Sequence, residues 1–128
     1  MKKLERLAIF MILLVLTMPL TFALTITSTS ATIITDESAT ITWDTNEDAD
    51  SKVSYGVEIP PNQEEFDGTD TQEHSIQLTN LDSDTQYYYA VTSDGPNLVT
   101  DHNSGNYYSF TTLATPSIII SYISKNNS

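Results

Sequence analysis

The stretch that decides the fold is Leu81-Asp82-Ser83-Asp84-Thr85-Gln86-Tyr87, which runs directly into Tyr88-Tyr89-Ala90-Val91-Thr92. A leucine, a short polar turn and a tyrosine that opens a β-rich run form the pattern of a tyrosine corner. In this corner the tyrosine hydroxyl bonds to the backbone a few residues upstream and locks one edge of a Greek-key sandwich. We therefore expect Leu81 and Tyr87 to be structural anchors.

Alternating apolar and polar residues recur on both sides of this stretch, as strands with one buried face require. The clearest run covers residues 38–44, where Ala39, Ile41 and Trp43 share one face, so Trp43 is predicted to lie in the core. Other such runs cover residues 24–34, 52–56, 75–79, 87–91 and 107–112. Turn residues separate the runs, which indicates an all-β sandwich or barrel. The tyrosine corner favours the Greek-key sandwich.

Three predicted connections are rich in carboxylates or turn residues, and they cover residues 45–50, 58–73 and 93–106. The last is longer than a plain hairpin needs. We expect it to form a contact surface together with the nearby residues 45–50. Its candidate binding residues are Asp94, Asn97, Asp101, His102 and Asn103.

Residues 1–23 have the pattern of a secretory signal peptide. Three basic side chains precede an apolar run over residues 7–16, and the small residue Ala23 stands at the expected cut site. We expect cleavage after Ala23 and a secreted or cell-surface protein. The alternative is a retained membrane anchor, for which the run is marginal because a spanning helix needs about 20 residues. The domain is then predicted over residues 24–113, and residues 114–128 are a tail or the start of a further segment.

The chain is strongly acidic, with 17 acidic side chains, 5 basic ones and a net charge of −12. Residues 1–23 hold three basic side chains and one acidic, so the remainder has a net charge of −14. Such a surface repels nucleic acid and anionic membranes. We expect a protein or glycan partner at the cell envelope, and membrane contact only if the N-terminal segment is retained.

The chain has no cysteine. An exported domain without disulfides must be held together by its core alone, and a domain of roughly 105 residues is large enough for that. The absence also argues against an antibody-type domain, whose two sheets are bridged by cysteines.

With these strands in place, residues 24–113 resemble a fibronectin type III domain. The resemblance rests on the tryptophan at the end of Ala39-Thr40-Ile41-Thr42-Trp43, on Leu81 with Tyr87, and on the closing Tyr108-Ser109-Phe110-Thr111-Thr112. It implies an all-β, Greek-key, immunoglobulin-like sandwich of about seven strands that serves as a spacer or binding module, usually without catalysis.

Two further segments suggest a subtype, Trp43-Asp44-Thr45-Asn46-Glu47 and Ser51-Lys52-Val53-Ser54-Tyr55-Gly56. They are similar to fibronectin-like domains of exported prokaryotic proteins and to the domain that precedes the catalytic part of purple acid phosphatases. Ser83 and Asp84 depart from the usual proline and glycine of the corner turn. The resemblance implies an exported interaction or spacer module. The alternative is the accessory domain of a larger secreted hydrolase, metallophosphoesterase-like, without its catalytic part.

Oxygen-bearing side chains at alternate positions form a weak calcium candidate: Asp44, Asn46, Asp48 and Asp50. Calcium needs six to eight oxygen ligands wrapped around it by one turn. Here Ala49 occupies the position where an EF-hand loop requires glycine, and Tyr55 the position of its final glutamate. A solvated acidic surface is therefore the favoured interpretation.

The sequence predicts no catalytic, cofactor or metal residue, because it contains neither a nucleophile elbow nor a phosphate-binding glycine loop. His74 and His102 could bind a transition metal, but we expect two separate surface histidines. Tyr88 and Tyr107 are predicted to face outward on neighbouring strands. They could dock a sugar or a peptide, although a stabilising cross-strand pair is the simpler expectation.

Overall fold

The computed structural model describes residues 2–5 and 22–118, so the apolar run 7–16 and the end of the chain from residue 119 lie outside the described residues. The described elements are β1 (Ile26–Thr32), β2 (Ala39–Gly56), β3 (Gln63–Leu78), β4 (Gln86–Asp94), β5 (Leu98–Asp101), the 3₁₀ turn η1 (Asn103–Gly105) and β6 (Tyr108–Thr111). In this part of the chain, no helix is long and apolar enough to cross a membrane.

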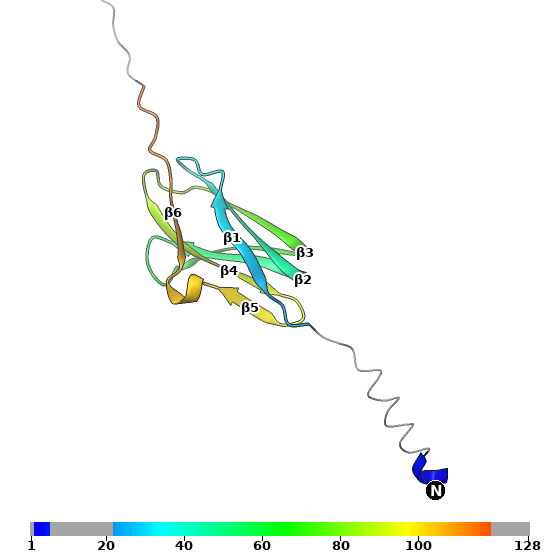
Figure 1. Ribbon diagram of the computed structural model, residues 1–128. Coiled ribbons are helices and arrows are strands. Elements are labelled where there is room, and N and C mark those ends of the chain that lie inside the picture. Colours follow the sequence, from blue (N-terminus) through cyan, green and yellow to red (C-terminus); the bar gives the residue numbers. More distant parts are fainter. Residues whose placement is uncertain (1, 6–21, 119–128) are drawn as a thin grey trace, which may run out of the picture.

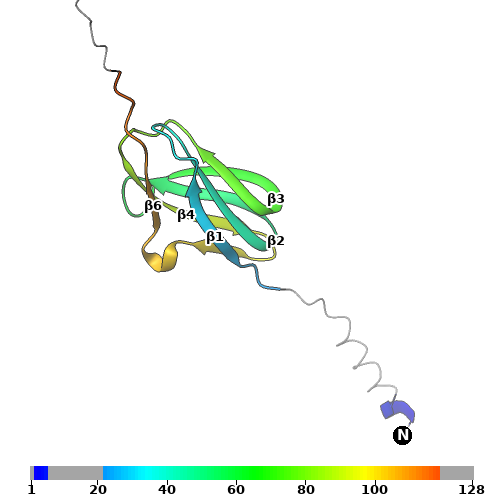
Figure 2. The ribbon, with the colours of Figure 1, turned by 45° about the horizontal axis from the view of Figure 1, so that its top comes forward.

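The strands form two layers because β2 and β3 are long and are shared between both (Figure 1, Figure 2). In one layer the first half of β2 pairs with β1 and with the end of β3. In the other, the second half of β2 lies between the start of β3 and β4, and β4 also pairs with β5 and β6. The register of β2 and β3 shifts between Asp44 and Ser51, where the pair passes from one layer to the other. β5 and β6 pair with successive parts of β4 and so occupy one position in the sheet. Three strand positions in one layer and four in the other confirm the predicted all-β sandwich.

The core lies between the layers and is built from the inward positions of the alternating runs. Trp43, only 1% exposed, is the largest of the fully buried side chains. The other core residues are Ala39, Ile41, Val53, Tyr55, Ile76, Leu78, Leu81, Tyr87, Tyr89, Val91 and Phe110. All of them follow residue 24, so the segment from Leu24 onward carries its own hydrophobic core, the main source of folding free energy.

The turn before β4 has the contacts of a tyrosine corner. The Tyr87 hydroxyl accepts a hydrogen bond of 2.9 Å from the Asp82 backbone N–H. Leu81 is buried, and its N–H donates to the Glu37 carbonyl at 3.0 Å. Asp84, at the position of the family's glycine, has a φ of 48°. Aspartate is one of the few residues that enter this left-handed region readily, so the turn keeps its shape without glycine.

Replacing Tyr87 by phenylalanine is expected to lower the free energy of unfolding by about 1 kcal/mol, because the Asp82 N–H loses its acceptor. The matched control is Tyr88→Phe, since the Tyr88 hydroxyl only reaches the exposed Gln86 side chain at 3.4 Å. That control should change stability by less than about 0.5 kcal/mol. Urea titration measures both values. Equal losses would contradict the assignment of Tyr87 to the inward face of β4 and of Tyr88 to its outward face.

The three connections are shorter in the structure than the sequence predicted. Residues 45–50 continue β2 instead of forming a loop, and β3 begins at Gln63, inside the predicted connection 58–73. The predicted connection 93–106 contains β5 and η1. In each case polar composition suggested a loop, whereas backbone pairing with a neighbouring strand extends the sheet.

Candidate functional site

A buried polar cluster, formed by Thr45, Ser51, His74 and Ser93, adjoins the Trp43 side chain in the core. The Trp43 Nε1–H donates to the Ser93 hydroxyl at 3.0 Å, and both residues are buried. The indole ring also stacks on the His74 imidazole, with ring centroids 4.8 Å apart and an interplanar angle of 3°. The strands β2, β3 and β4 therefore meet at Trp43 through packing and through a hydrogen bond.

His74 is not the surface histidine that the sequence suggested, because it is only 3% exposed. Its Nε2 lies 2.8 Å from the Thr45 hydroxyl and its Nδ1 lies 2.7 Å from the Ser51 hydroxyl. Thr45 already donates its hydroxyl proton to the Glu47 carbonyl, so it must accept from Nε2–H, which leaves Nδ1 to accept from Ser51. Both ring nitrogens of the neutral imidazole are thus engaged within the protein.

Burial lowers the pKa of His74 below its ordinary value of 6.5, and the negative charges of Asp44 and Asp50 oppose this shift. A neutral, doubly bonded imidazole has no nitrogen lone pair left for a metal ion or for activating a substrate. The cluster is therefore suited to fixing the core.

The calcium candidates lie on the outward face of β2, where Asp44, Asn46 and Asp48 are exposed and Asp50 is half-buried. Alternate residues of a strand are about 7 Å apart, so four of them in a row cannot all ligate one ion at Ca–O distances of about 2.4 Å. In addition, Asp48 accepts from the Gln72 side chain and Asp50 from the Asp94 N–H. Within residues 2–5 and 22–118 no cluster of three or more His, Asp or Glu residues could hold a metal ion.

The acidic surface gives an expected response to salt. Adding sodium chloride from 0.01 M to 0.1 M should raise the melting temperature, because the Debye length falls from about 30 Å to about 10 Å and screens the like charges. Millimolar calcium and magnesium should then act alike. A saturable shift with calcium alone, removed by Asp48→Asn and Asp50→Asn together, would contradict this prediction and identify a specific site. Differential scanning calorimetry measures all of these shifts.

The structure separates the predicted binding residues into two groups. The first lies in the turn between β4 and β5, beside residues 45–50, the polar half of β2. Here the Asp94 N–H donates to the Asp50 carboxylate at 2.8 Å. A Cβ on Gly95 would lie 2.5 Å from the Asp48 carbonyl oxygen, so only glycine allows this close approach. The Asn97 side chain accepts from the Leu24 N–H at 2.8 Å.

The second group lies at the other end of β5, where Asp101 ties three strands together. Its carboxylate accepts from the hydroxyls of Thr29 on β1 and Tyr108 on β6, at 2.9 and 2.8 Å. Burial, then the Asp101 carboxylate, raises the pKa of Tyr108. Asp101 also accepts from the Asn103 N–H, and the His102 Nδ1 accepts from the Gly105 N–H. These side chains stabilise the η1 turn, so Asp101 has a structural role that its sequence position did not reveal.

The predicted outward pair of tyrosines does not form. Tyr88 lies opposite Ser109 in the register of β4 and β6. Tyr107 precedes β6 with a left-handed φ of 56°, and its ring lies near His102, with centroids 6.1 Å apart. The left-handed backbone at Tyr107 takes its side chain out of the strand alternation on which the prediction relied.

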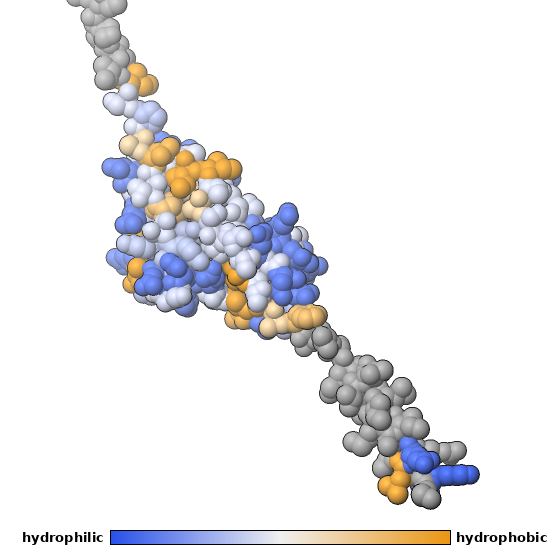
Figure 3. All heavy atoms as spheres, viewed as in Figure 1, coloured by the Kyte–Doolittle hydropathy of each residue, from blue (hydrophilic) through white to orange (hydrophobic). Residues whose placement is uncertain are grey.

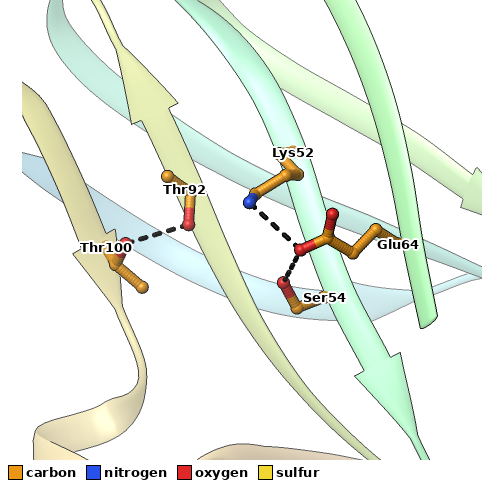
Figure 4. A network of polar contacts seen from close by, with 5 residues as sticks. All are labelled: Lys52, Ser54, Glu64, Thr92 and Thr100. Carbon is orange, nitrogen blue, oxygen red and sulfur yellow. Dashed lines mark hydrogen bonds and ion pairs between the residues drawn. The ribbon is translucent and has the colours of Figure 1, made fainter. Parts of the chain in front are cut away.

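The outer face of the second layer carries short polar contacts (Figure 4). The Lys52 ammonium lies 3.1 Å from the Glu64 carboxylate, which also accepts from the Ser54 hydroxyl. The hydrogen bond from Lys52, and then its positive charge, lowers the pKa of Glu64. Thr92 and Thr100 are hydrogen-bonded on the neighbouring strands. The exposed ion pair between Lys52 and Glu64 contributes little to stability.

Comparisons with known proteins agree with this architecture. The solution structure of a fibronectin type III domain derived from human KIAA0970 protein has a TM-score of 0.53 and 17% identity, with 80% of this chain and 85% of that chain covered. The sensor domain of the anti-sigma factor RsgI4 in Pseudobacteroides cellulosolvens has a TM-score of 0.52 and 21% identity, with 79% and 100% covered. At these identities the likeness concerns the fold. A comparison with curated proteins gives no match.

The fold therefore defines a fibronectin type III-like sandwich, as the sequence resemblance predicted. The family model "Purple acid Phosphatase, N-terminal domain" matches residues 21–112. Because the match spans well over half of the chain, the chain belongs to this family of N-terminal domains.

Proposed function

We propose that this chain is a non-catalytic interaction or spacer module that works outside the cell. The observation that carries the proposal is the position of the two ends of the sandwich. The chain enters beside β1 and the β4–β5 turn, and it leaves beyond β6 at the opposite end (Figure 1). A domain with this geometry holds the segment that follows β6 away from whatever binds at the opposite end, beside Leu24.

The chemistry of the surface indicates the class of partner. Between residues 22 and 118 the only basic side chain is Lys52, and Glu64 already neutralises it. An acidic, hydroxyl-rich surface favours a neutral glycan or a basic protein and disfavours phosphate backbones. We expect contacts at the β4–β5 turn and at the η1 turn, where Asn and Asp side chains are exposed.

Two measurements test this proposal. The protein from residue 24 onward should hydrolyse neither phosphomonoester nor glycoside probes above the buffer rate, and turnover would contradict a non-catalytic role. The same protein should co-sediment saturably with isolated cell envelopes. Trypsin treatment of the envelopes would remove a protein partner, whereas periodate oxidation would remove a glycan. Absence of saturable binding to either preparation would contradict an interaction role.

A second candidate function is that of an accessory domain for a metallophosphoesterase-like hydrolase. The family match supports it, together with exposed apolar residues at the end where the chain leaves. Ile33 is 76% exposed and Leu113 is 57% exposed, and the Leu113 N–H bonds to the neighbouring Thr35 carbonyl. Figure 3 shows apolar atoms gathered at this end. Ile33 also has a left-handed φ of 46°, which is unusual for a β-branched residue.

The second candidate has its own test. A metallophosphoesterase domain of the host, added in trans, should bind the unchanged protein, and Ile33→Asp with Leu113→Asp should abolish binding. Phe66→Asp is the matched control, because Phe66 is 62% exposed on β3, away from the chain exit. Equal binding by all three proteins would contradict an apolar docking surface at this end.

A further inference from the structure

We propose that Asn97 and Asn46 form a binding site for a new N-terminus, created when the peptide bond between Ala23 and Leu24 is hydrolysed during export. This inference rests on the exported location proposed above. The site would receive an α-ammonium group and the first backbone amides of the processed chain.

The boundary of burial lies at the predicted cut. Phe22 is 59% exposed and Ala23 is also exposed, whereas Leu24 is only 3% exposed. None of the described side chains that precede Leu24 is buried, so Leu24 is the first side chain that the fold buries. The signal-peptide pattern and the burial boundary are independent observations, and both identify the same peptide bond.

Three hydrogen bonds hold the backbone at this point. The Leu24 N–H donates to the Asn97 Oδ1 at 2.8 Å, and the Thr25 N–H donates to the Asn46 Oδ1 at 2.7 Å. The Asn46 Nδ2–H donates to the Ala23 carbonyl at 3.1 Å. The first two bonds involve atoms that remain in the processed chain. Only the third is lost with the leaving segment.

The two asparagines come from separate parts of the fold. Asn46 lies on the polar half of β2 and Asn97 lies in the turn between β4 and β5. Residues 24 and 25 thus connect the edge of β1 to a turn of the other layer. A processed N-terminus held here would continue directly into β1, which begins at Ile26.

The chemistry of hydrolysis fits these acceptors. A processing peptidase outside this chain adds water across the bond: the Ala23 carbonyl carbon becomes a carboxylate, and the Leu24 nitrogen takes up protons to become an ammonium. The nitrogen gains N–H donors, so it can still donate to the Asn97 Oδ1. The positive charge is also favoured in a chain whose net charge is −14 without residues 1–23.

The test measures how strongly the α-amino group is protected in a protein that begins at Leu24. A trace amount of acylating reagent is added at several pH values, and mass spectrometry of the N-terminal peptide gives the rate. We expect the native protein to react about fivefold more slowly than Asn97→Ala, the factor that one hydrogen bond of ordinary strength provides. Asn62→Ala, an exposed asparagine in another loop, is the matched control and should react like the native protein.

A second variant tests whether the α-ammonium group itself contacts the side chain at position 97. Asn97→Asp keeps the acceptor and adds a negative charge, so the pKa of the α-amino group should rise above that of the unchanged protein. Trp43 fluorescence confirms that each variant is folded. Reaction of the native amine at the rate of the urea-unfolded chain, or an unchanged pKa in Asn97→Asp, would overturn the proposal. If the host instead retains the protein inside the cell, the export proposal fails while amine protection in vitro is still measurable.

Discussion

Trp43→Ala is expected to lower the free energy of unfolding by about 3–5 kcal/mol, the range observed when a large buried aromatic side chain is truncated. Three losses combine at this position. The indole leaves a cavity in the core, the His74 ring loses its stacking partner, and the fully buried Ser93 hydroxyl loses the indole N–H. A small domain has a total stability of about 5–15 kcal/mol, so this variant should be close to unfolding.

The matched control for Trp43 is Phe66→Ala, because Phe66 is aromatic but 62% exposed on β3. It should cost less than about 1 kcal/mol, as surface substitutions commonly do. Urea titration of both variants measures the difference. A cost below about 1 kcal/mol for Trp43→Ala would contradict the placement of the indole in the core.

His74→Ala is expected to cost about 2–4 kcal/mol, because it removes a buried ring and leaves the Thr45 and Ser51 hydroxyls without their ring partner. His74→Phe separates these contributions, since it retains a ring for stacking on Trp43 but restores neither hydrogen bond. It should cost about 1–3 kcal/mol. If His74→Phe is as stable as the unchanged protein, the two hydrogen bonds do not contribute to stability.

The same residue predicts how stability depends on pH. Burial lowers the pKa of His74 in the folded protein below its ordinary value of 6.5, so the unfolded chain binds a proton at a higher pH than the folded one. The contribution of the neutral His74 ring to the free energy of unfolding is fully present above pH 6.5. It is lost as the pH falls toward the lower pKa of His74 in the folded protein. Urea titrations at pH 7.5 and 5.5 should show this loss in the unchanged protein. The loss should be smaller in His74→Phe, and an equal loss in both would contradict the assignment.

The fold could be predicted because its signals are local. Leu81 and Tyr87 are only six positions apart, and their contacts follow from the turn between them. The alternation that identified Trp43 is also a local property, since it depends only on which face of a strand each residue occupies. These patterns were sufficient for the sandwich and for most of its core.

The buried polar cluster was missed although its signal was present. His74 shares the inward phase of Ile76 and Leu78, and Ser93 shares that of Tyr89 and Val91. Extending the alternation by two residues would have placed both inside. Polar identity argued against it, because burying such groups is favourable only when they are hydrogen-bonded, and the partners come from other strands. Those partners are separated by 50 residues for Trp43 and Ser93, a pairing that only the assembled fold reveals.

The polar half of β2 was also predicted wrongly, because its pairing partner is another strand. Composition suggested a loop over residues 45–50, yet Thr45, Ala49 and Ser51 all keep the inward phase of Trp43 and are buried. The strand continues because β3 pairs with it on both sides of the register shifts. The roles of Asn46, Asn97 and Asp101 depend equally on tertiary contacts, so their residue type alone could not separate a binding side chain from a structural one.

The measurement that tests the central proposal most directly is the location and first residue of the protein in its host. Cells are separated into medium, envelope and cytoplasm, and the N-terminal peptide in each fraction is identified by mass spectrometry. An exported module should be found in the medium or on the envelope with Leu24 as its first residue. Recovery in the cytoplasm with Met1 intact would contradict a function outside the cell.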